Sequence, residues 1–459
     1  MNLQEYADSL RGKRVAVLGL GVSNTPLVQF LLRNGIEVSG RDKSDREKIG
    51  DRANKLEEEG AKLFLGDEYL ENLTEEVIFR TPGIRPDLPQ ITAAVERGAV
   101  LTSEMEAFFE VCPCRILAVT GSDGKTTTTT ILSELLKAAG RQVFVGGNIG
   151  TPLFTKAGEM KPEDLAVLEL SSFQLMTMKK SPSLAVVTNL APNHLDVHKS
   201  MEEYTRAKMN IFLHQGKNGV AVLNADNSVT ATFPPACPGE VRTFSRRGSV
   251  SHGYYALDGV IYRKMDGKTE PILREEEIFL PGKHNVENYL AAFCAADGLV
   301  SSDVMRSVAR TFKGVEHRIE HVRTLDGVDY YNDSIASSPS RTIAGLRSFP
   351  QKVILIAGGK DKGVPFDELG REILLHVKKL VLTGYTAEKI HAAVENAPGY
   401  AGDPPIIITD GFDEAIWTAR KLAHPGDVVI LSPACTSFDR FKNFAERGRR
   451  FKEIVNEME

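Results

Sequence analysis

The feature that most constrains this chain is an apolar run followed by a glycine turn and a Lys-Thr pair. Residues 115–120 read Arg-Ile-Leu-Ala-Val-Thr, and residues 121–126 read Gly-Ser-Asp-Gly-Lys-Thr. Apolar residues then recur at helical spacing up to Gly140. A strand, a glycine turn and a helix in this order predict a phosphate-binding loop in an α/β domain. Val119 replaces the first glycine of the longer form of this loop, and a purely structural turn is the alternative.

The residue types of this turn suit phosphate chemistry. Glycines let backbone N–H groups approach phosphate oxygens, and the helix N-terminus adds positive potential. Lys125 can reach terminal phosphates, and the Thr126 hydroxyl can ligate magnesium.

Three successive series of apolar runs alternate with helical stretches, and a length of 459 residues allows about three domains. Predicted strands cover residues 14–18, 36–39, 77–79 and 99–101, then 115–120, 165–170, 184–189 and 219–223, and finally 352–357, 380–383, 406–409 and 428–431. Such alternation predicts mostly parallel sheets covered by helices. We therefore predict an α/β fold with Rossmann-like first and third domains and a P-loop-type central domain, at residues 1–103, 104–314 and 315–459.

The central series contains a different pattern between about residues 240 and 280. Tyrosines and β-branched residues at 254–255 and 260–262 flank Asp258-Gly259, which is a hairpin signal. A small antiparallel patch is therefore expected in the central domain.

Composition excludes several classes of protein. Hydrophobic residues make up 42% and charged residues 25%, which is typical of a globular protein. The formal net charge is −5 with no basic block, so we expect no nucleic-acid partner. No apolar run is long enough to span a bilayer, the N-terminus lacks a signal-peptide pattern and the five cysteines are scattered. We expect a cytoplasmic protein without membrane insertion and with free thiols.

Two polar side chains follow predicted strands of the central domain. Glu169 ends the apolar run at 165–168, and His194 follows the run at 184–189. Both positions face the crevice where α/β sheets bind ligands. Glu169 is a candidate catalytic or magnesium-binding carboxylate, with a pair to a nearby lysine as the alternative. His194 is a candidate magnesium ligand, although a lone histidine is more often structural.

Lys208 falls on the apolar face of the predicted helix 202–212, four residues after Tyr204. One interpretation is an aliphatic stem that packs while the ammonium group reaches water. The other is a lysine of lowered pKa that carries a carbamate or contacts an anion.

The N-terminal turn Gly19-Leu-Gly-Val-Ser-Asn24, with Asp42 after the second predicted strand, resembles a dinucleotide fingerprint. Asn24 stands where that fingerprint has its third glycine, which weakens the dinucleotide reading. Any nucleotide diphosphate group fits the same turn.

These residues together resemble the Mur ligase family over the whole chain. The motifs that carry the resemblance are residues 120–126, 146–150 (Gly-Gly-Asn-Ile-Gly), 169–174 (Glu-Leu-Ser-Ser-Phe-Gln), 193–196 (Asn-His-Leu-Asp), 207–208, 282–285, 317–318, 331–334 and 432–444. The resemblance implies that ATP phosphorylates the L-alanine carboxylate of UDP-N-acetylmuramoyl-L-alanine. The amine of D-glutamate then attacks the acyl phosphate, as a step of peptidoglycan precursor synthesis.

The same resemblance implies residue roles and cofactors. Lys125, Glu169, His194 and Lys208 are the implied catalytic residues, and ATP is used with two Mg²⁺ ions. Thr126 and Glu169 would hold one Mg²⁺, and His194 with carbamylated Lys208 would position the second. His194 has an alternative role in removing the amine proton. The implied enzyme is a monomer whose partners are its small-molecule substrates.

The implied binding residues form three groups. ATP is implied to contact Gly121, Ser122, Asp123, Gly124, Lys125, Thr126, Thr127, Asn285, Asn288, Arg318 and Asp333. The UDP substrate is implied to contact Gly21, Val22, Ser23, Asp42, Thr81, Pro82, Gly83, Asn148, Ser171 and Gln174. D-Glutamate is implied to contact Ser337, Lys362, Ser437 and Phe444.

The chain departs from the family pattern at two places. Ile335 stands where many relatives carry a lysine, so we place no cation there and carry Ser337 only as a hydroxyl donor. Lys43-Ser44 follows Asp42 where some relatives have Thr-Arg.

Three other functions are alternatives to this interpretation. A ligase of the same architecture with another acceptor, such as a folylpolyglutamate synthase, is disfavoured by residues 437–444. An NAD-dependent oxidoreductase leaves Lys125, Glu169 and Lys208 unexplained. A non-catalytic nucleotide-binding protein would be expected to lack the metal ligands that are present.

Overall fold

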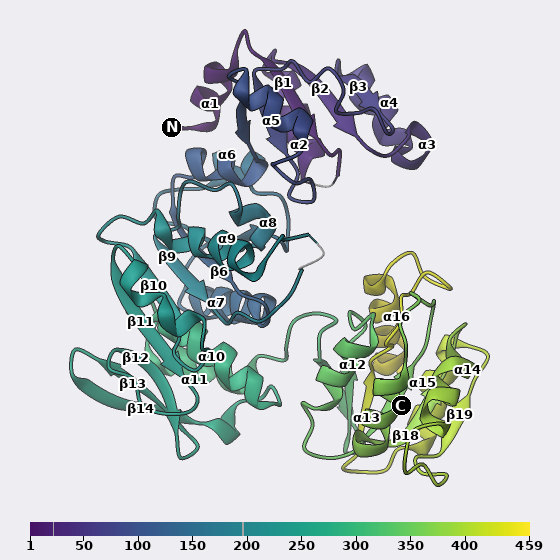
Figure 1. Ribbon diagram of the computed structural model, residues 1–459. Coiled ribbons are helices and arrows are strands. Elements are labelled where there is room, and N and C mark those ends of the chain that lie inside the picture. The colour runs from purple at the N-terminus through teal and green to yellow at the C-terminus, as the bar shows by residue number, and fades with distance from the viewer. Residues whose placement is uncertain (22, 195–196) are drawn as a thin grey trace. The chain divides into compact units, whose positions relative to one another are not determined.

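The computed structural model describes residues 1–21, 23–194 and 197–459. The chain forms two compact units, Met1–Glu275 with Glu287–Val308, and Glu276–Val286 with Ala309–Glu459. The first unit contains two β-sheets and the second contains one (Figure 1). Among the described residues, no helix is long and apolar enough to cross a lipid bilayer.

The first sheet has five parallel strands in the order β3-β2-β1-β4-β5. Its strands are β1 Arg14–Leu18, β2 Glu37–Asp42, β3 Lys62–Leu65, β4 Val77–Arg80 and β5 Val100–Thr102, and its helices are α1 Leu3–Leu10, α2 Asn24–Arg33, α3 Arg46–Ile49, α4 Asp51–Glu58, α5 Pro89–Glu96 and α6 Glu104–Val111. The strand order reverses between β1 and β4, and the loops after these two strands leave the same edge. Open α/β sheets bind ligands at such a position.

The second sheet has nine strands in the order β14-β13-β12-β11-β10-β9-β6-β8-β7. Its strands are β6 Arg115–Thr120, β7 Val143–Gly147, β8 Leu165–Glu169, β9 Leu184–Val187, β10 Val220–Asn224, β11 Glu240–Ser245, β12 Gly253–Leu257, β13 Val260–Met265 and β14 Lys268–Arg274. The pairings from β7 to β12 are parallel, and β12, β13 and β14 pair antiparallel. The predicted antiparallel patch is confirmed, and it continues the main sheet at one edge.

The strands of the second sheet are connected by helices α7 Lys125–Ala138, α8 Ser172–Leu175 and α9 Met201–Leu213 and by short 3-10 turns η1 Phe154–Glu159, η2 Thr230–Thr232 and η3 Pro234–Ala236. The 3-10 turn η4 Glu275–Glu277 and helices α10 Lys283–Ala296 and α11 Ser302–Thr311 follow the last strand, β14. The central position of β6 places the turn that follows it between the ends of β8 and β9.

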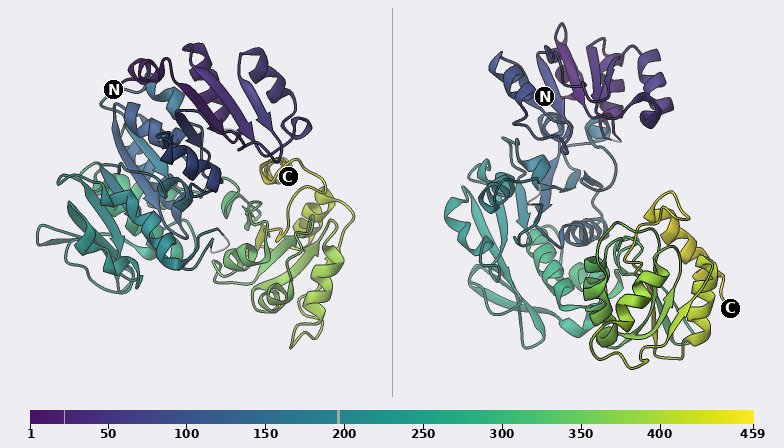
Figure 2. Two further views of the ribbon diagram at one scale, coloured as in Figure 1. Left: turned by 45° about the horizontal axis from the view of Figure 1, so that its top comes forward. Right: turned by 45° about the vertical axis from the view of Figure 1, so that its right-hand side comes forward.

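The third sheet has six strands in the order β15-β16-β20-β17-β18-β19. Its strands are β15 Glu320–Leu325, β16 Val328–Asn332, β17 Val353–Ala357, β18 Val377–Leu382, β19 Ile406–Ile408 and β20 Val428–Leu431, and its helices are α12 Pro339–Leu346, α13 Asp367–His376, α14 Ala387–Glu395, α15 Phe412–Leu422 and α16 Phe444–Glu457. Helices α12, α13 and α14 lie on one face of this sheet and α15 and α16 on the other (Figure 2). Their apolar residues form a separate buried cluster on each face. Only β15 and β16 pair antiparallel, and the sequence did not predict that hairpin.

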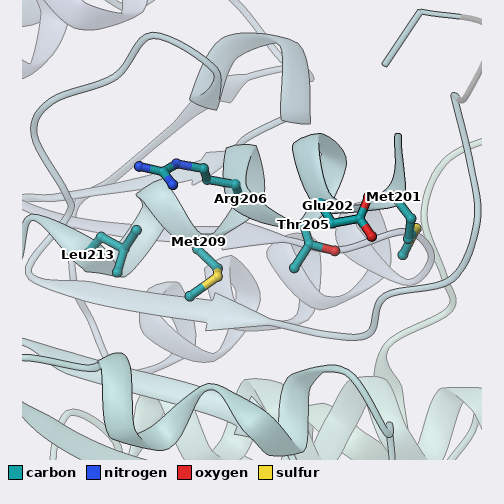
Figure 3. Close-up of a pocket in the computed structure, with 6 residues that line it drawn as sticks. All are labelled: Met201, Glu202, Thr205, Arg206, Met209 and Leu213. Carbon is teal, nitrogen blue, oxygen red and sulfur yellow. The ribbon is translucent and has the colours of Figure 1, made fainter. Parts of the chain in front are cut away.

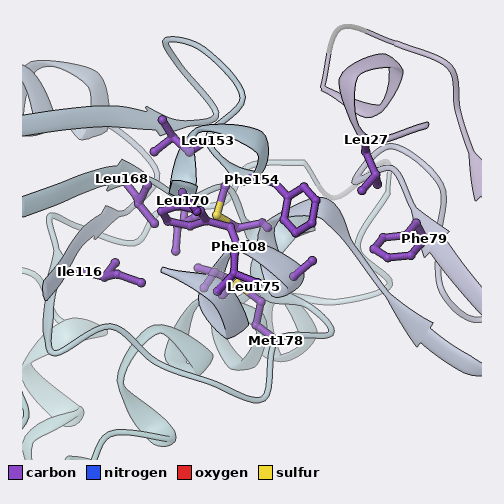
Figure 4. Close-up of a cluster of buried hydrophobic side chains, with 14 of the residues drawn as sticks. Leu27, Phe79, Phe108, Ile116, Leu153, Phe154, Leu168, Leu170, Leu175 and Met178 are labelled. Carbon is purple, nitrogen blue, oxygen red and sulfur yellow. The ribbon is translucent and has the colours of Figure 1, made fainter. Parts of the chain in front are cut away.

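The two sheets of the first unit share a hydrophobic core. One cluster of buried side chains runs from Leu27 and Phe79 of the first sheet region to Leu168 and Leu175 of the second (Figure 4). The ring of Phe154 lies 5.5 Å from that of Tyr6 and 5.2 Å from that of Phe30. Burial of aromatic rings across this junction explains why both sheets belong to one compact unit.

Candidate functional site

The turn after β6 has a backbone that only glycine fits at two positions. Gly121 has φ +151°, and a Cβ there would lie 1.9 Å from Thr188 Oγ1. Gly124 has φ +77°, and a Cβ there would lie 2.4 Å from Asn288 Oδ1. Helix α7 begins directly after this turn at Lys125. The predicted strand, glycine turn and helix are therefore present as a phosphate-binding loop would require.

Glu169 is buried at the end of β8, with 1% of its surface exposed. Its Oε2 accepts a hydrogen bond from Thr126 Oγ1 at 2.7 Å, and its Oε1 accepts one from Asn148 Nδ2 at 2.7 Å. Because the ends of β7 and β8 adjoin, residues from three separate motifs meet here. Hydroxyl and carboxylate oxygens are the ligands that Mg²⁺ prefers, so Thr126 and Glu169 fit a magnesium site.

Two lysines converge on one carbonyl oxygen of the loop. Gly121 O accepts from Lys125 Nζ at 3.0 Å and from Lys208 Nζ at 2.8 Å. Lys208 is only 2% exposed, and its Nζ also donates to Thr120 Oγ1 at 3.2 Å. Burial lowers the pKa of Lys208 well below its usual range, Lys125 lowers it further, and Glu169 acts in the opposite direction. The packed-stem alternative, with the ammonium group in water, is therefore wrong for this lysine.

His194 lies in the loop after β9 and has φ +55°. Its ring packs edge-on against Phe173, with 5.1 Å between centroids, and Phe173 stacks on His198 at 5.3 Å. His198 Nε2 lies 2.9 Å from Ser172 Oγ. The loop that carries His194 is thus attached to helix α8.

Side-chain hydrogen bonds hold helix α8 and the loop after β6 in the candidate site. Gln174 Oε1 accepts from Ser171 N at 2.9 Å and from Ser171 Oγ at 3.0 Å, so these two predicted substrate residues cap the helix. Among the other loop residues, Ser122 Oγ lies 3.0 Å from Tyr204 Oη, Thr127 is buried and Asp123 is exposed.

The N-terminal glycine turn is held by the carboxylate of Asp42. Asp42 Oδ2 accepts from Leu20 N at 2.7 Å, and Asp42 Oδ1 accepts from Ser44 N at 2.8 Å. Asn24, in place of the fingerprint's third glycine, is buried and donates to Gly19 O at 2.8 Å. The Asn24 side chain thus links the start of helix α2 to the turn by a hydrogen bond, where a glycine would allow close helix–strand packing.

The remaining predicted residues of the UDP site lie around this turn. A Cβ on Gly19 would lie 2.6 Å from Thr81 Cγ2, so the turns after β1 and β4 touch. Gly21 has open space around it, Ser23 is the N-cap position of α2, and Pro82 and Gly83 follow Thr81 in the second turn. Val22 lies outside the described residues.

The predicted ATP residues are divided between the two units. In the first, Asn288 Oδ1 accepts from Thr128 Oγ1 of helix α7 at 3.2 Å. In the second, Asn285 Nδ2 donates to Pro281 O at 2.6 Å. Also in the second, Asp333 accepts from Ser432 Oγ at 2.8 Å, and burial raises its pKa to about 7 although Ser432 and Arg318 lower it.

The predicted D-glutamate residues all belong to the second unit. Lys362 Nζ lies 3.3 Å from Ser337 Oγ, so the structure brings these two together. Ser437 is buried in the loop after β20, and Phe444 begins helix α16. Phe444 O accepts from Ser334 Oγ at 2.8 Å.

A surface cavity of about 520 Å³ lies along α9 and is distinct from the predicted site. Its lining residues are Met201, Glu202, Thr205, Arg206, Met209 and Leu213 (Figure 3). They lie on one side of the helix, whereas Lys208 is buried with Tyr204 and Ile211. None of the predicted site residues lines it.

Sequence reasoning missed two residues that shape the phosphate loop. Thr188 Oγ1 donates to Asp123 O at 2.6 Å, and Asn189 Oδ1 accepts from Asp123 N at 2.9 Å. Both follow β9, which neighbours β6 in the sheet. Their position after the adjacent parallel strand is the signal that could have found them.

The geometry defines a P-loop α/β protein with a buried carboxylate and a buried lysine beside the loop. Three family models match the chain: Mur ligase MurD-like, N-terminal domain (residues 13–103), Mur ligase middle domain (119–296) and Mur ligase, glutamate ligase domain (317–435). The chain belongs to the Mur ligase family, as its relatives also show.

Curated relatives match over the full length. The UDP-N-acetylmuramoylalanine–D-glutamate ligase of Acetivibrio thermocellus is 52% identical, covering 100% of this chain and 99% of its own. The protein of the same name from Clostridium novyi is 51% identical, with 99% of each chain covered.

Solved structures share the fold. UDP-N-acetylmuramate-alanine ligase MurC from Thermotoga maritima has a TM-score of 0.58 at 18% identity, covering 97% of this chain and 99% of its own. MurF ligase from Thermotoga maritima in complex with ADP has a TM-score of 0.56 at 20% identity, covering 98% and 96%. The three-domain α/β architecture expected from the sequence is that of this family.

Proposed function

We propose that this chain joins D-glutamate to UDP-N-acetylmuramoyl-L-alanine in an ATP-dependent ligation through an acyl phosphate. The observation that carries the proposal is the agreement between two findings. Thr126 and the buried Glu169 and Lys208 gather at the phosphate loop, and full-length relatives bear this ligase name. The reaction forms one amide bond and releases ADP and phosphate. It would serve peptidoglycan precursor synthesis.

In this proposal the phosphate loop binds ATP. The loop residues 121–127 would surround the phosphates, and Lys125 would stabilise charge on the transferred phosphoryl group. Thr126 and Glu169 would hold one Mg²⁺, which neutralises charge on phosphate oxygens when bound. Asn285, Asn288, Arg318 and Asp333 would hold the rest of the nucleotide.

Lys208 is proposed to carry a carbamate. Its neutral amine would add to CO₂, forming an N–C bond and releasing one proton to solvent. Burial and the nearby Lys125 favour the neutral amine, as the lowered pKa indicates. The resulting carboxylate would supply, with His194, oxygen and nitrogen ligands for a second Mg²⁺. His194 would alternatively accept the proton from the attacking amine.

Each of the three proposed domains would bind a different substrate. Residues 1–103 would bind the UDP substrate through Gly21, Val22, Ser23, Asp42 and the turn at residues 81–83. Residues 104–314 would bind ATP and contact the substrate through Asn148, Ser171 and Gln174. Residues 315–459 would bind D-glutamate through Ser337, Lys362, Ser437 and the backbone at Phe444. Charged and hydroxyl donors of this kind suit a dianionic amino acid.

The proposal extends to the cellular setting. We propose a monomeric enzyme. ATP and UDP-linked sugars are water-soluble metabolites of the cytoplasm, which supports a cytoplasmic location. Small-molecule substrates are the proposed partners, with no role for nucleic acid or membrane insertion.

The test is phosphate release with ATP, Mg²⁺ and UDP-N-acetylmuramoyl-L-alanine, across D-glutamate, L-glutamate, L-lysine and diaminopimelate. The products are then weighed by mass spectrometry. We expect release only with D-glutamate, together with the mass of the new amide. Reaction with another acceptor would overturn the assigned specificity, and no reaction with any acceptor would overturn the ligase assignment.

The carbamate has its own test. Wild-type protein equilibrated with ¹³C-bicarbonate is expected to show one carbamate resonance in ¹³C NMR, and the Lys208→Met variant is expected to lack it. Lys199→Met is the matched control, because Lys199 is exposed and pairs with Asp87 on the surface. A spectrum without a Lys208-dependent signal would contradict the proposal.

A further inference from the structure

A buried arginine, which no predicted function uses, lies behind the turn at residues 81–83 that is proposed to bind the UDP substrate. Arg80 ends strand β4 and is only 1% exposed. Its Nη1 donates to three carbonyl oxygens of the following turn, those of Thr81 at 3.3 Å, Pro82 at 3.1 Å and Ile84 at 2.6 Å. One guanidinium group therefore fixes the direction of three peptide groups.

The direction of these peptides matters for anion binding. The Pro82–Gly83 peptide is trans, so its N–H points away from its C=O. With Pro82 O turned toward Arg80, the Gly83 N–H is turned to the opposite side, and Gly83 is exposed. A backbone N–H held outward in this way is available to a phosphate oxygen.

The same guanidinium also reaches the second sheet of this unit. Arg80 Nη2 donates to Phe173 O at 3.0 Å and to Thr177 Oγ1 at 3.4 Å. Phe173 belongs to helix α8, which Ser171 and Gln174 cap. Thr177 Oγ1 in turn donates to Glu106 Oε2 at 3.2 Å. Arg80 thus joins two elements that the proposed function assigns to the UDP substrate.

The electrostatics agree with this position. Burial lowers the pKa of Arg80 to about 10, with Glu106 acting in the opposite direction, so the group stays charged at neutral pH. A buried cation that donates to several carbonyl groups is costly to replace, because the carbonyls lose their donor. Lysine can keep the charge, but its ammonium group lacks the planar fork that spans two elements.

We propose that Arg80 is a positioning residue that sets the Thr81–Gly83 turn against helix α8 and thereby shapes the site for the diphosphate of the UDP substrate. The inference rests on the proposed function for the identity of that substrate. Arg80 acts through the backbone of the turn and through α8. Its effect should therefore fall on the UDP substrate and leave ATP and D-glutamate unaffected.

The experiment compares Arg80→Met and Arg80→Lys with the wild-type chain. We expect KM for UDP-N-acetylmuramoyl-L-alanine to rise about 10- to 100-fold in Arg80→Met, the range for lost hydrogen bonds to a charged group. Arg80→Lys should recover part of the loss. KM values for ATP and D-glutamate should stay within about twofold of wild type, since a merely structural role would move all three together.

Two variants control for general effects on this region. Arg97→Met removes another guanidinium-to-carbonyl bond of the first sheet region, to Leu73 O at 2.7 Å, and should leave all three KM values unchanged. Thr177→Val removes only the hydroxyl at the α8 end of the Arg80 contacts, and should raise KM for the UDP substrate about two- to fivefold.

Calorimetric titration of the UDP substrate without ATP separates this inference from the proposed ligation. If the wild-type chain binds the UDP substrate but forms no amide, the ligation fails while the Arg80 comparison of Kd values still applies. Unchanged UDP-substrate affinity in a folded Arg80 variant overturns the inference, as does an equal loss for ATP. Where neither Arg80 variant folds, unchanged affinity in Thr177→Val overturns it.

Discussion

Two glycine turns of the first unit have the same local pattern but differ in what their carboxylate does. In the N-terminal turn, Asp42 accepts two backbone N–H groups and holds the loop itself. In the central turn, Glu169 accepts from side chains, Thr126 and Asn148, that belong to separate motifs. Each carboxylate ends a parallel strand next to the strand that precedes the turn.

The comparison teaches that a strand, a glycine turn and a nearby carboxylate do not by themselves define a chemistry. The central turn has two lysines on one loop carbonyl and a buried carboxylate, which suit the proposed phosphate and its metal ion. In the N-terminal turn the carboxylate of Asp42 is engaged by backbone N–H groups, which suits a turn held in shape for the proposed UDP substrate. The central turn suits catalysis, and the N-terminal turn suits binding.

The largest effect is expected at Lys125. The Lys125→Met change removes the cation beside the proposed transferred phosphoryl group, so kcat should fall at least about 10³-fold. Binding of the UDP substrate, measured by calorimetry, should stay as in wild type. Lys137→Met is the control, because Lys137 lies on the same helix but pairs with Glu134 on the surface. An active Lys125→Met enzyme would remove the catalytic half of the comparison.

The next effect distinguishes the two turns by their glycines. Gly121→Ala would put a Cβ 1.9 Å from Thr188 Oγ1, so the loop must shift, and we expect kcat/KM for ATP to fall about 100-fold. Gly21→Ala meets no atom within 4 Å, and KM for the UDP substrate should change less than about threefold. Steady-state kinetics test both, and equal losses in the two variants would show that the turns are not different in this respect.

A third carboxylate, Asp333, directly follows strand β16 and, like Glu169, is buried. Its pKa is raised to about 7 by burial, so the folded state keeps a proton that the unfolded state loses above about pH 4. The stability from this group is therefore present at low pH and lost as pH rises through about 7. The asparagine in Asp333→Asn has no carboxyl proton to lose. At pH 8 its free energy of unfolding should therefore exceed that of wild type by on the order of 3 kcal/mol.

Thermal unfolding from pH 5 to 8 measures this difference. The Tm of Asp333→Asn minus that of wild type should grow by about 5 °C over the range. The exposed Asp410, changed to Asn, should give a difference near zero throughout. A constant difference for Asp333→Asn would mean that its burial does not set its protonation.

A smaller kinetic effect than at Lys125 or Gly121 is expected at Asp42. In Asp42→Asn one carboxylate oxygen becomes an N–H₂ donor, so one of the bonds to Leu20 N and Ser44 N is lost. KM for the UDP substrate should rise about 10-fold, with kcat and the KM for ATP unchanged. Substrate-saturation kinetics check this, and a loss of kcat instead would give Asp42 a role like that of Glu169.

Local sequence signals predicted much of the fold, but only where they were distinctive. Asp258-Gly259, with φ values of +49° and +75°, gave the predicted hairpin. Asp326-Gly327 has φ values of +51° and +74° and closes the β15–β16 hairpin, which we did not predict. The β15–β16 hairpin has more charged and half-exposed residues, so the alternation of apolar and polar residues along its strands was less apparent. Strand β3, with its half-exposed residues, was missed for the same reason.

The amino-acid sequence alone predicted the phosphate loop, the parallel sheets and the candidate residues Glu169 and Lys208. Each of these predictions depends on residue types and apolar periodicity within a short stretch of chain. The tertiary structure decided which of them meet. The order of the parallel strands brings Asn148 to Glu169 and Asn189 to Asp123 across 21 and 66 residues of chain. Burial depends on that packing as well, so only the folded structure makes Lys208 an amine of low pKa and places Arg80 behind its turn.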